Sequence, residues 1–117
     1  SYEIKMVYKF GKNPDVFVLS PKPLVLADGK SRLPHVYDHD KQWLCLYHKP
    51  SREWTPNMMI ADTIVPWISE WLLHYEYWVV TGVWDIVNYN IMYTKYIYSL
   101  KIFVIVYECI YAHNCFL

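Results

Sequence analysis

The sequence lacks the cysteine pairs of disulfide-rich proteins, the excess positive charge of nucleic-acid-binding proteins and the N-terminal pattern of a signal peptide. Its three cysteines (Cys45, Cys109 and Cys115) are an odd number without CxxC spacing, so a disulfide framework is excluded. Eleven basic and eleven acidic residues cancel and form no basic run, which disfavours non-specific nucleic-acid binding. Nothing before the first strand-like segment is typical of a signal peptide. These absences predict a reduced cytoplasmic protein.

The C-terminal part of the chain lacks residue types that are common elsewhere in it. Residues 85–117 contain no glycine, proline, arginine or tryptophan, whereas all six tryptophans lie between positions 43 and 84. We therefore predict a core domain over residues 1–84 and a divergent apolar tail over residues 85–117. Residues 97–111 are nearly all apolar, which fits a helix or a strand. Lys101 and Glu108 interrupt them, which makes a membrane span a poor interpretation.

Alternating and short apolar segments dominate the first third of the chain. Apolar residues make up 55% of the sequence, enough for one modest core in 117 residues. Residues 2–10, 16–19 and 24–26 read as strands separated by turn residues. Their short connections favour antiparallel pairing, and so predict a β-meander. Residues 33–56 lack clear periodicity, apart from a short apolar run at 43–47 that suggests a further strand.

The strongest periodic signal covers residues 59–80. Apolar residues recur there at steps of three and four, as on the buried face of an amphipathic helix. Pro66 cannot donate to the carbonyl four residues back, so the helix should kink there or begin near Asp62 or Thr63. Gly82 supplies a stop signal. With the meander, this helix predicts an α+β fold in which a long helix packs on one face of an antiparallel sheet.

Cys45 is the candidate nucleophile, because it precedes a loop and the predicted helix, whereas the other cysteines lie in the tail. A thiol serves both as nucleophile and as leaving group, which acyl transfer through a thioester requires. Between Leu44 and Leu46, however, Cys45 also fits a small buried strand residue, and composition alone favours that interpretation.

The stretch HVYDHD, residues 35–40, places two histidines shortly before Cys45. His35, Asp38 and His39, with His48 as a further candidate ligand, invite a metal-site hypothesis. Ligands four residues apart suit a helix, but the local sequence is not helical and no second ligand cluster follows, so we predict no metal. A catalytic base at His35 is a further hypothesis. A hydrogen-bonded loop histidine is the simpler one.

The order of these features resembles that of the ubiquitin-conjugating enzymes. Residues 44–46 match the family's Ile/Leu-Cys-Leu segment, and residues 54–56 (Trp-Thr-Pro) match the Trp-Ser-Pro that leads into its helix. Over residues 16–84, the phrases LPHVYD, LCLYH, EWTP, IADTIVPW and SEWLLHYE are similar to bacterial ubiquitin-conjugating enzyme-like proteins of CBASS antiphage operons. Each phrase alone is a weak signal, and their shared order and spacing carry the likeness.

This resemblance implies thioester chemistry at Cys45. The cysteine would carry the C-terminus of a ubiquitin-like protein, or of the cGAS-like nucleotidyltransferase that such operons encode, and pass it to an amine of an acceptor protein. An activating enzyme is a further implied partner, and no cofactor is needed. The implied fold is that of the ubiquitin-conjugating enzymes without their N-terminal helix. The alternative is a catalytically inactive binding module of the same fold.

The same resemblance gives two histidines an expected role. His35 corresponds to the family histidine that shapes the active-site loop, although it stands ten residues before Cys45 instead of eight. The family asparagine that stabilises the oxyanion has no counterpart here. His39 stands at its offset, six residues before Cys45, and as an N–H donor could polarise a developing oxyanion. A solvated loop residue is the alternative.

Overall fold

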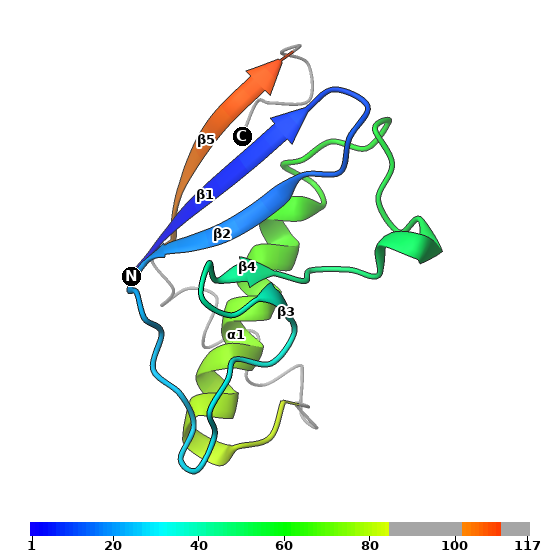
Figure 1. The fold of residues 1–117 in the computed structure, drawn as a ribbon. Helices are drawn as coiled ribbons and strands as arrows, with labels where there is room; N and C mark the ends of the chain where they lie inside the picture. The colour runs from blue at the N-terminus through cyan, green and yellow to red at the C-terminus, as the bar shows by residue number, and fades with distance from the viewer. Residues whose placement is uncertain (85–101, 111–117) are drawn as a thin grey trace.

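A computed structural model of the protein describes residues 1–84 and the backbone of residues 102–110. Figure 1 shows the elements in chain order. They are the strands β1 (Tyr2–Lys9), β2 (Asp15–Ser20), β3 (Val36–Asp38) and β4 (Trp43–Leu44), the 3-10 helix η1 (Lys49–Ser51), the helix α1 (Ile64–Thr81) and the strand β5 (Ile102–Ile110).

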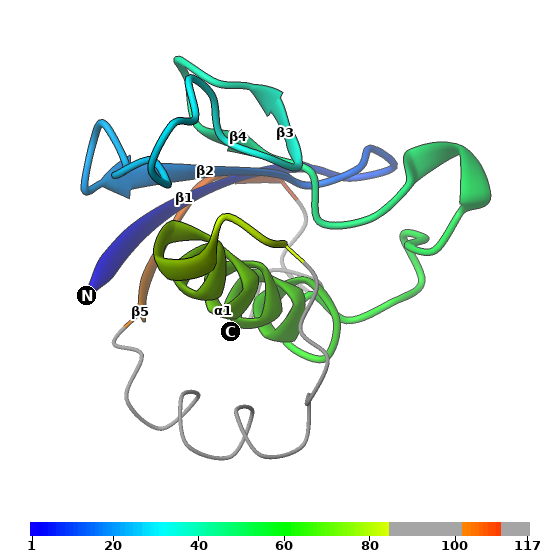
Figure 2. The ribbon, with the colours of Figure 1, turned by 90° about the horizontal axis from the view of Figure 1, so that it is seen from below.

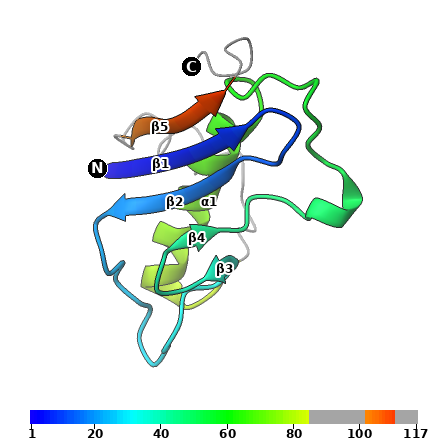
Figure 3. The same cartoon turned by 45° about the horizontal axis from the view of Figure 1, so that its top comes forward.

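The strands form one sheet in the order β3-β4-β2-β1-β5, which Figure 3 shows from its open side. The pairs β1–β2, β2–β4 and β3–β4 are antiparallel, whereas β5 lies parallel to β1 at the edge. The predicted α+β class and the antiparallel pairing of the first strands are confirmed. The parallel strand β5 falls within residues 97–111, for which the sequence left helix and strand open.

The expected third strand over residues 24–26 is wrong. The Leu24 N–H donates to Gln42 Oε1 at 2.7 Å, and the Val25 carbonyl accepts from the Tyr75 hydroxyl at 2.9 Å. Side chains from distant segments therefore satisfy backbone groups that a strand would have paired with a neighbour. The strand that pairs with β2 is instead β4, which forms a hairpin with β3. The strand predicted over residues 43–47 is therefore confirmed only for Trp43–Leu44.

Helix α1 begins where the sequence placed its alternative start. Thr63 is the N-cap residue, so Pro66 is the third residue of the helix. Its missing N–H costs no helical hydrogen bond, because the carbonyl four residues back precedes the helix. At the other end, Gly82 adopts the left-handed conformation (φ 73°) and donates its N–H to the Trp78 carbonyl at 2.7 Å. Both predicted ends are confirmed.

Figure 2 shows α1 lying across one face of the sheet. Alternate residues of β1 point toward this helix, and they join its apolar face in one core. The fully buried members are Ile4, Met6, Tyr8, Val16, Val18, Ile60, Ile64, Ile68 and Leu72. The outer face of the sheet carries a row of aromatic rings, in which Trp43 lies 5.8 Å from Phe17 and 5.0 Å from Tyr37 between ring centroids.

Part of the predicted tail takes part in the sheet. Strand β5 pairs along β1 from Tyr2 opposite Ile102 to Val7 opposite Tyr107. Residues 85–101 and 111–117 lie outside the described residues. The predicted division of the chain at residue 84 stays a prediction.

Candidate functional site

The backbone of Cys45 is tied directly to the segment before β3. The Cys45 N–H donates to the His35 carbonyl at 3.0 Å, and the Trp71 indole Nε1–H of α1 donates to the same oxygen at 3.0 Å. His35 adopts a positive φ of 48° at this point. The His35 carbonyl therefore joins the cysteine, the hairpin and the helix.

A cavity of about 180 Å³ opens beside Cys45. Its walls come from the hairpin on one side, from α1 on the other, and from the residues just after α1. The lining residues are His35, Cys45, Leu46, Trp67, Glu70, Trp71, His74 and Trp84. A thiol, a carboxylate, two imidazoles and three indoles thus meet in one place. Leu44 is buried and Leu46 packs against the core, while Cys45 between them is partly exposed.

Trp84 holds the two imidazoles of the cavity. Its ring stacks on His35 at 4.8 Å between centroids, and on His74 at 5.5 Å. The indole of Trp71 meets it edge-on at 5.4 Å. The left-handed turn at Gly82 reverses the chain after α1, which allows Trp84 to fold back on the helix.

The tautomer of neutral His74 follows from its hydrogen bond. Its Nδ1 lies 2.9 Å from the Trp84 carbonyl oxygen. A carbonyl can only accept, so Nδ1 carries the proton. In the neutral ring the basic lone pair then belongs to Nε2. His74 therefore has the form of a base whose orientation is fixed by its other nitrogen.

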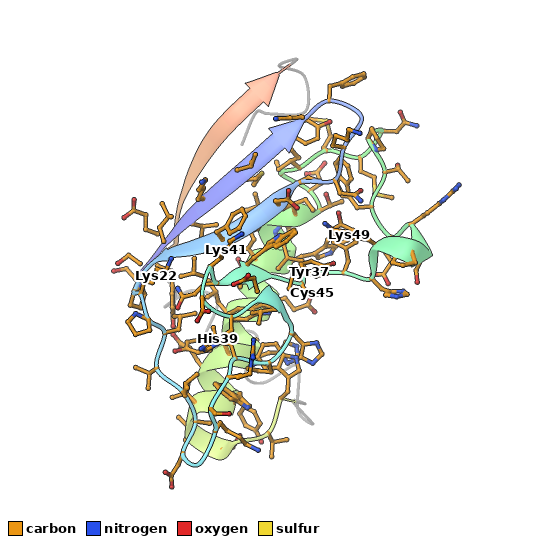
Figure 4. The ribbon with its side chains drawn as sticks, in the orientation of Figure 1. Lys22, Tyr37, His39, Lys41, Cys45 and Lys49 are labelled. Carbon is orange, nitrogen blue, oxygen red and sulfur yellow. The ribbon has the colours of Figure 1, made fainter. Side chains whose placement is uncertain are left out.

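Two tyrosines lie close to the thiol. The Cys45 Sγ–H donates to the Tyr47 carbonyl at 3.6 Å, and the Tyr37 hydroxyl donates to the same carbonyl at 3.3 Å; Figure 4 shows Tyr37 beside Cys45. Burial, followed by the hydrogen bond with Cys45, raises the pKa of Tyr37. Burial, with the nearby Asp15 and Cys45, raises the pKa of Tyr47 to about 12. Both phenols therefore stay neutral around the sulfur at physiological pH.

The Tyr47 hydroxyl gives a testable prediction. The residue is 7% exposed, and its oxygen has no hydrogen-bond partner among the described residues. A buried hydroxyl without a partner costs about 1–3 kcal/mol, so Tyr47→Phe should raise the free energy of unfolding by about 1 kcal/mol. Urea denaturation measures this change, with Tyr77→Phe on α1 as the control that should change little. A loss of stability in Tyr47→Phe would contradict the assignment.

His39 lies apart from the cavity. Its Nδ1 accepts the Leu33 N–H at 3.1 Å, and the ring is not among the lining residues. Asp38 accepts the Lys41 N–H at 2.8 Å and so closes the hairpin turn. Figure 4 shows His39 in this turn, away from Cys45. The structure thus brings His35 to the cysteine and leaves His39 at a distance. The predicted oxyanion role of His39 stays a prediction.

Only His35 and Cys45 among the lining residues had a predicted functional role. The polar residues Glu70 and His74 were not predicted to lie at the site, nor was Trp84. Glu70 and His74 are four residues apart, which places both on one helical face. That spacing was the available signal. Which face of the helix would meet Cys45 depends on tertiary packing, so the spacing alone could not join them to the thiol.

Residues 1–84 contain no group of three or more His, Cys, Asp or Glu side chains that could hold a metal ion. In the same part of the chain, no helix combines the length and apolar character that crossing a bilayer requires.

Comparison with known proteins identifies the family. Residues 1–90 match the family model E2-CBASS, described as Type II CBASS E2 protein. No curated protein and no solved structure gives a match. The match covers more than half of the 117 residues and confirms the resemblance seen in the motifs. The chain belongs to the type II CBASS E2 proteins, an E2-like component whose partners lie within the CBASS system.

Proposed function

We propose that the protein is a cysteine-dependent acyl carrier with the ubiquitin-conjugating arrangement. Cys45 accepts the C-terminus of a donor protein as a thioester and passes it to an amine. The observation that supports this most directly is that Cys45 lines a cavity which also presents imidazole and carboxylate groups. The donor is a ubiquitin-like protein or the cGAS-like nucleotidyltransferase of the same operon. The reaction takes place in the bacterial cytoplasm, where thiols stay reduced, and needs no cofactor.

Two exchanges of bonds make up the reaction. In the first, the Cys45 thiolate attacks the carbonyl of a donor C-terminus held as a thioester by an activating enzyme. The new C–S bond forms, the old one breaks, and the activating enzyme leaves as thiolate. In the second, an amine attacks the thioester on Cys45, and an amide forms as the sulfur leaves.

The structure gives more support to the role proposed for His35 than to the oxyanion role proposed for His39. The carbonyl of His35 accepts from both Cys45 and Trp71, which supports a positioning role for the loop that contains it. His39 accepts a hydrogen bond through Nδ1, so its neutral ring carries a proton on Nε2. That tautomer suits an oxyanion donor. Its distance from the cavity is the argument against this role.

A binding module without catalysis is the second candidate, and the outer face of the sheet favours it. The aromatic row over Phe17, Trp43 and Tyr37 is partly exposed, and Lys49 Nζ lies 4.8 Å from the Tyr37 ring and 5.2 Å from the Trp43 ring. Such a surface can bind a partner protein without any reaction at Cys45.

The test is adduct formation. The protein is mixed with the operon's nucleotidyltransferase, a matching activating enzyme and ATP, and the products are separated on a non-reducing gel. We expect an adduct that requires ATP, disappears with a thiol reductant and is absent in Cys45→Ala. Thiols cleave disulfides as well as thioesters, so the adduct must also be cleaved by hydroxylamine, which attacks a thioester and not a disulfide. Co-purification of the two proteins without any adduct would reject the carrier function in favour of the binding module.

A further inference from the structure

Any acyl transfer at Cys45 builds negative charge on one oxygen atom. When the sulfur attacks a carbonyl carbon, an electron pair of the C=O bond moves onto the oxygen. An N–H or O–H group beside that oxygen lowers the energy of the intermediate, because it donates a hydrogen bond where the charge develops. The donor that lies beside the Cys45 sulfur therefore decides how well this site can carry out such a transfer.

Two N–H donors near the cysteine are already engaged. The Cys45 N–H and the Trp71 indole N–H both donate to the His35 carbonyl, each at 3.0 Å. Neither can turn toward a substrate oxygen without breaking a bond that joins the hairpin to α1. His39 is held through its Nδ1 by the Leu33 N–H, and it does not line the cavity beside the cysteine. These three groups are therefore poor donors for an oxyanion on a substrate of Cys45.

The Tyr37 hydroxyl is a donor that lies beside the sulfur. It shares its acceptor, the Tyr47 carbonyl, with the Cys45 thiol: the hydroxyl oxygen lies 3.3 Å from the carbonyl oxygen and Sγ lies 3.6 Å from it. Figure 4 shows Tyr37 next to Cys45. Good O–H···O hydrogen bonds measure about 2.5–3.0 Å, so this hydroxyl is only weakly held. Its hydrogen can rotate about the C–O bond and turn from the carbonyl to an oxygen bound next to the sulfur.

The chemical state and the fixed position of Tyr37 both suit a donor. Burial, followed by the hydrogen bond with Cys45, raises the pKa of its hydroxyl, which therefore keeps its proton at neutral and moderately alkaline pH. Its ring is tilted against Trp43 at 5.0 Å between centroids, and the Lys49 ammonium lies 4.8 Å from the centroid of the Tyr37 ring. These contacts fix the ring, so the hydroxyl needs little reorganisation when charge develops beside it.

We propose that the Tyr37 hydroxyl donates a hydrogen bond to the oxyanion that forms when an acyl group is transferred to Cys45. This inference rests on the proposed thioester function and assigns it a further catalytic residue. The thiol first gives its proton to water. The thiolate attacks the carbonyl carbon of the incoming thioester, the new C–S bond forms, and the C=O electron pair moves onto the oxygen, which accepts the Tyr37 O–H. As the pair returns, the old C–S bond breaks and the donor's sulfur leaves as a thiolate. The phenol keeps its proton throughout.

The first experiment compares two reactions of the same sulfur in the full chain. A small glycyl thioester acylates Cys45 through an oxyanion, whereas iodoacetamide alkylates it by direct displacement, without one. Peptic digestion at low pH and mass spectrometry count only the modification of Cys45. Loss of one oxyanion donor in an enclosed site costs about 100-fold or more. Because Tyr37 is 43% exposed, we expect Tyr37→Phe to slow acylation by about tenfold or more, and alkylation by less than about twofold. Unchanged acylation, or equal slowing of both reactions, would overturn the proposal.

Two further variants make this comparison specific. Tyr77→Phe removes a hydroxyl from α1 outside the cavity and should leave both reactions unchanged. His39→Gln tests the other candidate donor: if it slows acylation and Tyr37→Phe does not, the oxyanion role belongs to His39 instead. The ratio of the parent's acylation rate to that of Tyr37→Phe should stay constant between about pH 6.5 and 9, because the phenol keeps its proton there. Unfolding midpoints of each variant exclude a loss of fold as the cause.

The second experiment tests the hydroxyl without any acyl transfer, and so separates this inference from the function on which it rests. ¹³C-labelled N-acetylglycinal adds reversibly to the thiol as a tetrahedral hemithioacetal, which NMR detects as a signal that is absent in Cys45→Ala. Tyr37→Phe should weaken this adduct by about 2- to 10-fold, the value of one hydrogen bond, and Tyr77→Phe should not. If Cys45 accepts no acyl group while the adduct depends on Tyr37, the carrier function fails and the donor role stands. If Tyr37→Phe is acylated at the parent rate, the donor role is rejected and the carrier function stands.

Discussion

Replacing Trp71 with alanine is expected to lower the free energy of unfolding by about 4 kcal/mol, in the range seen when large buried aromatics are truncated. The side chain is 4% exposed and stacks on Tyr75 at 5.7 Å between ring centroids. It also forms a wall of the cavity against Trp84. Truncation therefore removes core packing and one side of the candidate site together. Urea denaturation measures the loss.

Trp71→Phe separates packing from hydrogen bonding. Phenylalanine keeps much of the aromatic contact but cannot donate to the His35 carbonyl. Since that oxygen still accepts the Cys45 N–H, we expect a loss of only about 1–2 kcal/mol, from the indole bond and the smaller ring. If Trp71→Phe were as unstable as Trp71→Ala, the hydrogen bond rather than the packing would hold this part of the fold.

The elements that the sequence predicts well are those whose signal is local. Helix α1 follows from a period of three and four, from Gly82 at its end, and from the constraint that Pro66 places on its start. Strands β1 and β2 could be predicted because apolar residues alternate with other residues along the chain. The strand expected at residues 24–26 failed because its backbone partners, Gln42 and Tyr75, are distant side chains. No local pattern reports such a partner.

The candidate site shows the same division. Cys45 could be selected from its Leu-Cys-Leu context and its place before Trp54-Thr55-Pro56. The groups that surround it could not, because they meet only once α1 packs on the sheet and the turn at Gly82 returns Trp84 to the helix. The sequence therefore singles out the candidate cysteine, whereas only the tertiary structure shows which groups surround it.

Gln42 is the buried polar residue on which the loops around the site depend. It is 2% exposed, and its backbone adopts a positive φ of 52°. The side-chain Nε2 donates to the Val18 carbonyl at 3.0 Å and to the Pro21 carbonyl at 3.1 Å, while Oε1 accepts the Leu24 N–H at 2.7 Å. One side chain thus joins β2, the loop that follows it and the hairpin that leads to Cys45.

Gln42→Met should therefore lower the free energy of unfolding by about 3–4 kcal/mol, although methionine matches the volume of glutamine. The substitution leaves the Leu24 N–H and the carbonyls of Val18 and Pro21 without their side-chain partner, and each unsatisfied buried group costs about 1–3 kcal/mol. The carbonyl oxygens of Val18 and Pro21 each lose one hydrogen bond, but each oxygen can accept a second one. The total loss of stability therefore stays below the sum of three full penalties.

Lys41→Met, at the exposed neighbouring position, should change the free energy of unfolding by less than about 0.5 kcal/mol. Urea denaturation of both variants gives the comparison. A Gln42→Met variant as stable as Lys41→Met would show that packing, and not this set of hydrogen bonds, fixes the loops beside the cysteine.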